Sequence, residues 1–273
     1  MKQRFEQIDE SKLSAPQRRK SLPVRVGDLF IGGNNPVVIQ EMTTTHTSDI
    51  AKTVKQINVL RETGCRLVRI AVPDQHAARA LFVLKRETGM LLVADIHFDF
   101  RLALQSIESG ADKLRLNPGN IGAAYKVREV VAAAKDRGIP IRVGVNSGSL
   151  QRDIADKYGG ATPEGLVESA LREVALLERE GFYAIVVSIK SPDIDLTLRA
   201  NRLLAVKVRY PLHIGITEAG YGEEGKVRSI VGLSTLLLEG IGDTVRVSLT
   251  HPDRRENIRV CRKVLQLLNI PHT

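Results

Sequence analysis

"DKLRLNPGN", residues 112–120, sets an arginine between two leucines in a run that otherwise reads as a short buried β-strand. The run ends at Asn117-Pro118-Gly119, a combination that stops a strand and begins a turn. Arginine recurs in the same setting in "RLVRIAV" (66–72), "PIRVGVN" (140–146) and "DTVRVSL" (243–249). This recurrence indicates that the four runs occupy equivalent places in one repeated architecture.

From residue 36 onward, short β-branched runs alternate with longer segments of helical periodicity. In the clearest helical segment, 161–181, Thr162 can cap the amino end, Pro163 takes the first helical position and Gly181 ends the helix. Eight strand–helix units predict an α/β fold, a (β/α)8 TIM barrel over residues 36–273. An open, doubly wound sheet is the alternative. The expected strands are 36–42, 66–72, 91–95, 112–117, 140–145, 184–189, 212–216 and 244–249.

Residues 1–35 lie outside this repeat, and we expect them to form an N-terminal arm or hairpin. The stretch "VRVGDLFIGG" (24–33) predicts a hairpin that turns at Gly27-Asp28 and closes the bottom of the barrel. No linker or low-complexity tract is present, so the sequence predicts no second complete domain.

The chain has 273 residues and a formal net charge of +9, which favours acidic partners. Only 4% of the residues are aromatic and none is Trp, which argues against stacking of single-stranded nucleic acid. No run is long and apolar enough for a membrane span, and the amino terminus does not read as a signal peptide. Cys65 and Cys261 form no CxxC pair and are expected to be reduced thiols. We therefore expect a cytoplasmic protein that binds neither nucleic acid nor membrane.

Polar side chains at the carboxyl ends of the predicted strands would meet at one mouth of the barrel. Cations dominate this set, and unpaired cations in a low-dielectric cavity need a counter-anion. A guanidinium group suits phosphate oxygens, so several around one mouth predict a ligand with more than one phosphate. The alternative is that each arginine pairs with a structural carboxylate. The set comprises Glu41, Arg69, Arg115, Asn117, Arg142, Asn146, Ser188, Lys190, Arg246 and Ser248.

Asp95 and His97 lie two residues apart in "DIHFD" and therefore on one face of the third predicted strand. Asp99 extends this spacing to a pattern that looks like a metal site, but it lies past the strand end. We expect Asp95 and His97 to hydrogen-bond a substrate, and we predict no metal site.

Glu218 precedes a glycine-rich loop after the seventh predicted strand and is a candidate general acid or base. The loop 220–225 spells GxGxxG, the pattern of a dinucleotide-binding turn. Glu223 and Glu224 would face the pyrophosphate at the helix amino end, however, which disfavours a nucleotide. A flexible lid over the mouth is the preferred interpretation.

With these residues assembled, the chain resembles the 4-hydroxy-3-methylbut-2-enyl diphosphate synthases of the non-mevalonate isoprenoid pathway. The matching stretches run in the family's order and cover the chain from about residue 19 to its end. The resemblance implies an amino-terminal (β/α)8 barrel that binds 2-C-methyl-D-erythritol 2,4-cyclodiphosphate. The stretches are "VADIHFD", "LRLNPGNIG", "IPIRVGVNSGSL", "HIGITEAG" and "GIGDTVRVSLT".

The resemblance also implies roles for single residues. Asp95, His97 and Glu218 would face the erythritol portion as catalytic residues, with Glu218 a proton donor or acceptor. Two positions depart from the family, because Glu41 stands where serine is usual and His46 where aspartate is frequent. A carboxylate at Glu41 could disturb the charge balance of the mouth. The diphosphate would be contacted by Arg69, Arg115, Arg142, Lys190 and Arg246, helped by Asn117, Asn146 and Ser248.

In the family, a carboxy-terminal domain holds a [4Fe–4S] cluster through three cysteines and a glutamate, and ferredoxin or flavodoxin supplies electrons. Cys65 and Cys261 both fall in predicted barrel helices, so we expect no cofactor on this chain and the cluster domain to be absent.

The resemblance further implies a homodimer, and a chain that is inactive alone. We expect an excised substrate-binding barrel. The alternative is a non-redox protein that has lost the cluster domain and captures the cyclic diphosphate. A barrel enzyme of the dihydropteroate synthase type and a basic nucleic-acid binder are further alternatives.

Overall fold

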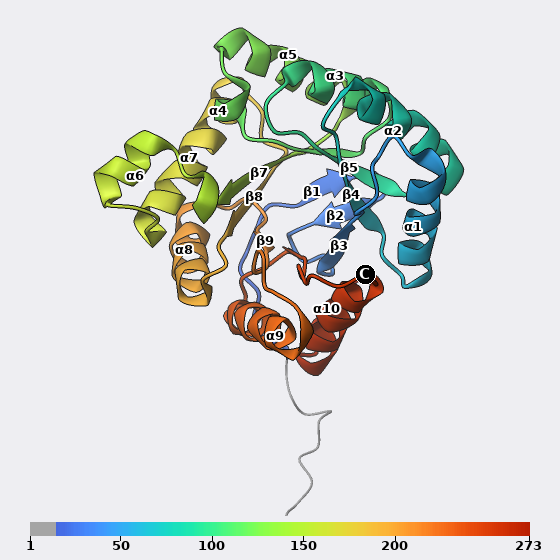
Figure 1. The fold of residues 1–273 in the computed structure, drawn as a ribbon. Coiled ribbons are helices and arrows are strands. Elements are labelled where there is room, and N and C mark those ends of the chain that lie inside the picture. Colours follow the sequence, from blue (N-terminus) through green and yellow to red (C-terminus); the bar gives the residue numbers. More distant parts are fainter. Residues whose placement is uncertain (1–14) are drawn as a thin grey trace, which may run out of the picture.

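Eight parallel strands stand side by side in the computed structural model, which describes residues 15–273. Their order is β8-β7-β6-β5-β4-β3-β10-β9, and helices surround them (Figure 1). The two ends of this series meet through a parallel bridge between Val187 and Leu212, where the Val187 N–H donates to the Pro211 carbonyl at 2.9 Å. The barrel is therefore nearly closed, and the predicted (β/α)8 TIM barrel is confirmed.

The observed strands lie close to the predicted positions, except that β6 and the last two strands are shorter than predicted. The chain leaves ladder geometry at Gly215, where a Cβ would lie 2.2 Å from the Arg246 carbonyl oxygen. Only glycine permits this close approach of two backbones. The strands are β3 (Val38–Met42), β4 (Leu67–Ala71), β5 (Leu91–Asp95), β6 (Lys113–Arg115), β7 (Ile141–Asn146), β8 (Ile185–Lys190), β9 (His213–Ile214) and β10 (Thr244–Val245).

At least one helix follows each barrel strand. α7 has the predicted ends, because Thr162 Oγ accepts from the Gly165 N–H at 3.1 Å, Pro163 is the first helical residue and Gly181 follows the last turn. No helix within residues 15–273 is both long and apolar enough to cross a membrane. The helices are α1 (Ile50–Glu62), α2 (Gln75–Thr88), α3 (Phe100–Glu108), α4 (Pro118–Ile121), α5 (Ala124–Arg137), α6 (Arg152–Tyr158), α7 (Pro163–Arg179), α8 (Ile194–Lys207), α9 (Gly222–Leu238) and α10 (Arg255–Leu267).

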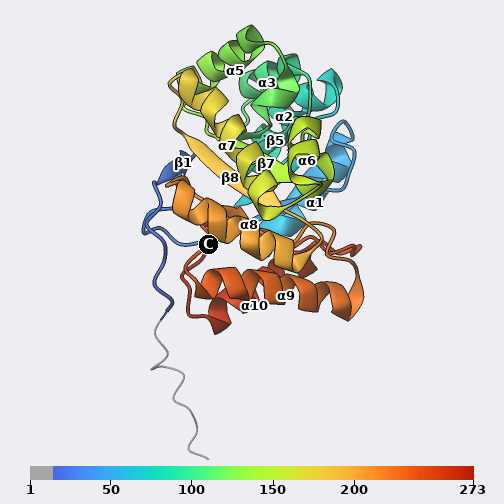
Figure 2. The same cartoon turned by 90° about the vertical axis from the view of Figure 1, so that its left-hand side faces the viewer.

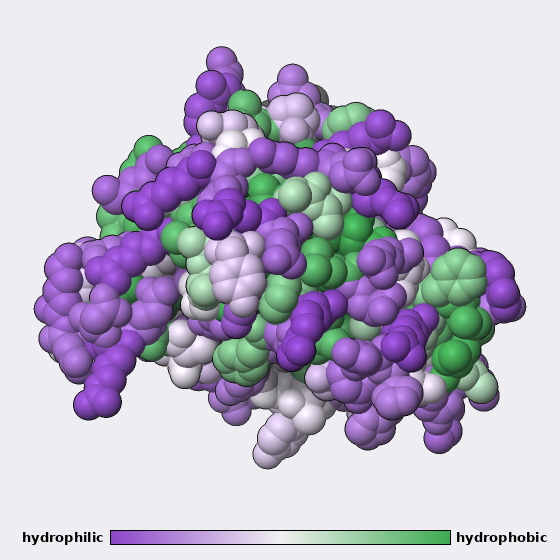
Figure 3. Space-filling view, turned by 90° about the horizontal axis from the view of Figure 1, so that it is seen from above, coloured by the Kyte–Doolittle hydropathy of each residue, from purple (hydrophilic) through white to green (hydrophobic). Residues whose placement is uncertain are grey.

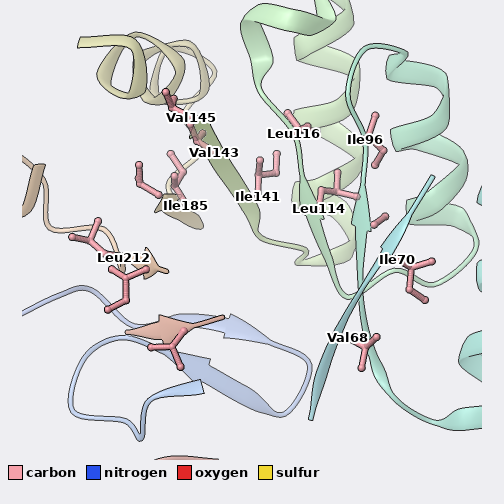
Figure 4. Packing of buried hydrophobic residues seen from close by; sticks show 14 of the residues in the cluster. Val68, Ile70, Ile96, Leu114, Leu116, Ile141, Val143, Val145, Ile185 and Leu212 are labelled. Atoms are coloured by element: carbon pink, nitrogen blue, oxygen red, sulfur yellow. The ribbon is translucent and has the colours of Figure 1, made fainter. Parts of the chain in front are cut away.

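The main hydrophobic core lies between the barrel strands and the surrounding helices. Val68 and Ile70 of β4, Ile141 of β7, and Leu114 and Leu116 in and after β6 are buried in it (Figure 4). Because successive side chains of a strand point to opposite faces, the residues between these apolar ones face the lumen. Among them are the arginines noted in the sequence.

The predicted hairpin is present and closes the amino-terminal end of the barrel. β1 (Val24–Val26) pairs antiparallel with β2 (Leu29–Ile31) around the turn at Gly27-Asp28, and β1 lies at one end of the barrel (Figure 2). Its apolar side chains form a second core with lumen-facing residues of four barrel strands. This core comprises Val24, Val26, Leu29, Ile31, Val38, Leu67, Val93 and Val186.

The segment before the hairpin binds the residues that lead into β9 and β10, beside the seam between β8 and β9. Asp243, 3% exposed, accepts hydrogen bonds from Arg18 Nη2 at 2.9 Å, Ser21 Oγ at 2.8 Å and the Leu212 N–H at 2.8 Å. Arg19 Nη1 and Nη2 donate to the carbonyls of Val208 and Tyr210, after α8. One buried carboxylate thus joins residues that are more than 200 positions apart.

The last residues of the chain pair with the start of β3. The Val37 N–H donates to the Pro271 carbonyl at 2.8 Å, and the Thr273 N–H donates to the Val37 carbonyl at 3.1 Å. The chain therefore returns to its first barrel strand after completing the ring of helices.

We predict that Asp243→Ala strongly destabilises the barrel, because it leaves Arg18 and two neutral donors without their buried acceptor. The expected loss in the free energy of unfolding is about 3–5 kcal/mol, measured by urea denaturation. Asp28→Ala is the matched control, since Asp28 is an exposed carboxylate paired with Arg66, and its midpoint should not change. Equal midpoints for both variants would show that the Asp243 contacts do not hold the seam.

Candidate functional site

Four arginines and one lysine converge inside the barrel from separate strands. Arg142 of β7 is close enough to Arg69 of β4, Arg115 of β6 and Arg246, which follows β10, for each to disfavour its charged state. The positive charges of Arg142, Arg246 and Arg69 likewise disfavour the charged state of Lys190, the last residue of β8. The strand parity inferred from the sequence predicts this grouping, and the structure shows it.

Arg142 lies in the middle of the group and lacks a carboxylate partner. It is 2% exposed, and Nη1 donates to Ser188 Oγ at 2.8 Å, while Nε and Nη2 have no partner within residues 15–273. The pKa of its guanidinium lies well below the ordinary value, first because the group is buried and then because Arg69 and Arg115 repel its charge. The site therefore holds an uncompensated positive charge.

Asp95, at the end of β5, is a carboxylate shared by two of the arginines. Arg115 Nη1 lies 3.4 Å from Oδ1, and Arg69 Nε and His97 Nε2 each lie 3.7 Å from Oδ2. Burial alone would raise the pKa of Asp95, but the charge of Arg69, with smaller effects of His97 and Arg115, lowers it overall. One carboxylate for two arginines leaves the group with a net positive charge.

Asn117 joins β6 to β7 through the backbone of Gly144. Its Nδ2 donates to the Gly144 carbonyl and its Oδ1 accepts from the Gly144 N–H, both at 2.9 Å. Arg115 Nη2 donates to the same carbonyl at 3.0 Å. A Cβ at residue 144 would lie 2.9 Å from Arg115 Nε, so glycine at this position lets the guanidinium lie flat against β7.

The charge of Glu41 is balanced by Arg254, a residue that the sequence analysis did not single out. Its Oε1 accepts from Arg254 Nη2 at 2.8 Å and from the Met42 N–H at 2.8 Å, and Arg246 Nε lies 3.5 Å away. The pKa of Arg246 falls to about 10, because burial outweighs the attraction of Glu41. The Glu41 carboxylate is therefore paired with Arg254, a contact that only the three-dimensional structure reveals.

A cavity of about 700 Å³ opens at the carboxyl ends of β3, β9 and β10. Arg246, Ser248 and Glu218 all line it, together with Arg254. Arg246 Nη1 donates to Ser248 Oγ at 3.3 Å, which aligns the guanidinium with the cavity wall. The cavity can admit a small ligand that contacts a carboxylate on one side and arginines on the other. The remaining lining residues are Met42, Thr43, Thr44, Leu249, Thr250, His251 and Pro252.

Glu218 is exposed and has a backbone φ of 48°, in the left-handed region that non-glycine residues rarely occupy. The flanking loop holds it there, because the Ala219 N–H donates to the Ser248 carbonyl and the Thr250 N–H to the Gly220 carbonyl, at 3.3 and 2.8 Å. The glycine-rich loop is thus anchored to the strand-end loop beside it, and Gly222 begins α9.

The other candidate residues lie at or after the ends of β3, β5 and β7, and His97 contacts both Asp95 and Arg115. His97 is 59% exposed and Asn146 is half-buried. Asp99 caps α3 through the Arg101 N–H, and His46 is exposed in the β3–α1 loop. Within the described part of the chain, no three His, Cys, Asp or Glu side chains are grouped closely enough to hold a metal ion.

Cys65 and Cys261 are both buried free thiols, and burial raises the pKa of each to about 12. Cys261 lies in α10 as expected. The expectation for Cys65 is wrong, because α1 ends at Glu62 and Cys65 lies in the turn before β4. The helix ends early because Gly64, with φ 79°, reverses the chain.

We predict that Asp95→Asn lowers the free energy of unfolding at pH 7 by about 3 kcal/mol, because two buried arginines lose their shared counter-charge. The pKa of Asp95 is lower in the folded protein than in the unfolded chain, where it is about 3.9. Its contribution is therefore present above about pH 4 and is lost as the pH falls toward the folded value. Urea denaturation from pH 7 to pH 3 should show the two proteins converging, and a constant difference would contradict this assignment.

Comparison with known proteins gives one consistent family. A family model described as "GcpE TIM-barrel domain" matches residues 21–262. A "4-hydroxy-3-methylbut-2-en-1-yl diphosphate synthase (flavodoxin)" from Caldanaerobacter subterraneus subsp. tengcongensis is 54% identical over 253 residues, which are 93% of this chain and 71% of the relative. A relative of the same name from Bacillus mycoides is 52% identical over 92% of this chain and 68% of its own length.

Solved structures with low sequence identity share the fold. The N-acetylneuraminic acid synthetase of Leptospira borgpetersenii has a TM-score of 0.64 at 13% identity, over 93% of this chain and 91% of that one. The dihydropteroate synthase of Yersinia pestis has a TM-score of 0.58 at 12% identity, over 90% and 98%. At this identity the likeness supports the barrel architecture alone.

Proposed function

The chain belongs to the 4-hydroxy-3-methylbut-2-en-1-yl diphosphate synthase family and contains its TIM-barrel domain, and from this premise we propose that the barrel binds 2-C-methyl-D-erythritol 2,4-cyclodiphosphate. The single observation that supports this most strongly is Arg142, a fully buried cation without a carboxylate partner. An uncompensated buried charge costs several kcal/mol in the ligand-free protein. A ligand that carries one negative charge on each of two phosphates would remove that cost.

We assign the diphosphate to the cationic group and the erythritol portion to the cavity beside it. Arg69, Arg142 and Lys190 would contact one phosphate from the lumen side, and Arg246 with Ser248 the other from the cavity wall. Asn146, with a free side chain at the end of β7, would add a hydrogen bond. Arg115 and Asn117 both donate to the Gly144 carbonyl. They would thereby hold β7 so that Arg142 and Asn146 can contact the phosphate.

Asp95, His97 and Glu218 are the proposed catalytic residues. In the family reaction, the ring opens at a carbon–oxygen bond and a hydroxyl group leaves. Glu218 lines the cavity and has no partner within residues 15–273, so its carboxyl group is free to move a proton at the departing hydroxyl. Its strained backbone holds the side chain at a defined place in the mouth. Asp95 and His97 would orient the sugar hydroxyl groups.

The described residues do not fit the [4Fe–4S] cluster that the family is expected to use. A cluster of this kind needs several thiolate ligands, and here both cysteines are buried, with their pKa values raised by burial to about 12. We therefore propose that these residues bind and orient the substrate but do not reduce it. The names of the relatives favour flavodoxin as the electron donor of a complete enzyme.

We predict that Arg142→Met weakens binding of the cyclic diphosphate about 10- to 100-fold in isothermal titration, because charge-assisted hydrogen bonds to the ligand are lost. The same variant should raise the free energy of unfolding of the ligand-free protein, since it removes an unpaired buried charge. Arg25→Ala, on the exposed face of the hairpin at the opposite end, is the control and should change neither quantity. If wild type and Arg142→Met bind alike, the site is assigned wrongly.

We also propose that the chain forms a homodimer through α9. This helix exposes a row of aliphatic side chains, with Val227, Ile230, Val231 and Leu238 each 40–58% exposed. Their spacing places them on one face of the helix, opposite the face that packs against the barrel. The face seen from above α3 and α5 is mainly hydrophilic but carries hydrophobic patches near its centre (Figure 3).

Val231→Glu is expected to convert the dimer to a monomer, because it places a charge in the centre of this row. Light scattering coupled to size-exclusion chromatography measures the change. Val206→Glu is the matched control, since Val206 is 83% exposed on the neighbouring helix α8. A wild-type protein that is monomeric at high concentration, or a Val231→Glu variant that remains dimeric, would rule out this interface.

A further inference from the structure

Two lysines inside the barrel have no partner for their amino groups. Lys190, the last residue of β8, is 7% exposed, and Lys113, the first residue of β6, is 0% exposed. Within residues 15–273, Lys113 Nζ is buried without a hydrogen-bond partner, and Lys190 Nζ, which is not fully shielded from solvent, makes no hydrogen bond or ion pair. Lysine is almost never fully buried without a counter-charge, so these two groups require an explanation.

The charged groups that act most strongly on Lys190 are cations. They are Arg142 on β7, Arg246 after β10 and Arg69 on β4. Burial first, and then these three charges, hold the pKa of Lys190 well below its ordinary value. The Lys190 amino group therefore gives up its proton more readily in the ligand-free barrel than an exposed lysine does.

Among residues 15–273, no carboxylate lies within ion-pair distance of Lys190. His213 of β9 is neutral, because burial and the nearby cations hold its pKa well below the ordinary value. Cys261 of α10 is a neutral thiol, since burial raises its pKa to about 12. Two of the carboxylates at the mouth are held by other cations, Asp95 by the arginines of β4 and β6, and Glu41 by Arg254.

We propose that Lys190 takes up a proton from solvent when the barrel binds a diphosphate, so that the ligand enters as an anion together with a proton. The inference rests on the proposed function. Lys190 Nζ lies against Gly215, 3.0 Å from where a Cβ would stand, and therefore at the level where β9 opens toward the mouth. A bound phosphate there would replace three repulsive neighbours with an attractive one, which restores the charged amino group.

Lys113 lies deeper in the barrel than Lys190, farther from the mouth and nearer the hairpin. It pairs in register with Val93, which packs against the hairpin at the closed end of the barrel. Its strongest charged neighbours are Arg142 and Arg69, and a ligand at the mouth lies beyond them. Lys113 should therefore stay neutral in both states, which makes it a matched control for Lys190.

The pH dependence of binding follows from the two states of Lys190. Its pKa is low in the free protein and higher in the complex. Between these two values, binding takes up about one proton, and the dissociation constant rises about tenfold per pH unit. Below the free-state value, the lysine is already charged and the dependence disappears.

Isothermal titration with the cyclic diphosphate, repeated in buffers of different ionisation enthalpy at one pH, counts the protons taken up. Each phosphate of this ligand retains a single strongly acidic oxygen, so the ligand itself does not titrate near neutral pH. Wild type should take up about one proton. Lys190→Met should bind more weakly with no uptake, whereas Lys113→Met should keep the wild-type uptake. Binding without proton uptake would overturn the inference alone, and no binding at all would overturn the proposed function with it.

A second measurement covers the case in which Lys190→Met is too weak a binder. In protein with ¹³C-labelled lysine, the Cε resonance of Lys190 should shift from the neutral to the charged position as the cyclic diphosphate is added, and that of Lys113 should not. An unchanged Lys190 resonance in a saturated complex, or proton uptake that persists in Lys190→Met, assigns the proton elsewhere and overturns the proposal.

Discussion

The concentration of positive charge in a closed lumen is the constraint on which the rest of this structure depends. Within the described residues, two buried carboxylates, Asp95 and Glu41, face five basic side chains in a small volume: Arg69, Arg115, Arg142, Lys190 and Arg246. Such an arrangement opposes folding, since repulsion and desolvation act together. It persists because the apolar layers around it are extensive, and the proposed doubly charged ligand would compensate the charge.

Apolar packing and the polar site occupy different parts of the barrel. The outward faces of the strands and the hairpin provide apolar contact, while the lumen above the hairpin is reserved for polar groups. Glycines 144 and 215 remove side chains at the two places where a cation must lie against a neighbouring strand. The stability of the barrel and the composition of its site are thus set by residues that alternate along the same strands.

The repeated strand–helix units predict the barrel, and the Gly27-Asp28 pair predicts the hairpin turn. The alternation of inward and outward side chains along each strand predicts that the arginines lie together. Each depends on local pattern, which a single sequence displays. The pairing of Glu41 with Arg254 does not follow from any local pattern, because the two residues are separated by 213 positions. The engagement of Asn117 with Gly144 and the shortening of β9 and β10 likewise depend on how close two backbones come, which residue type alone does not specify.

The contacts of Asp243 with Arg18 and of Val37 with Pro271 and Thr273 tie the beginning of the described chain to its end. These pairings have the largest sequence separations in the fold, so closing them carries a high loop-closure entropy and comes late. During synthesis the hairpin and the early strands wait for residues near 243 and 271 before the ring can close. Arg18 donates to the Asn35 carbonyl and the Thr273 N–H donates to the Val37 carbonyl, so both ends of the described residues lie beside the start of β3. A chain in which residues 15 and 273 were joined, and which was cut in an exposed helix–strand loop, would keep the same topology and change only the order in which the seam forms.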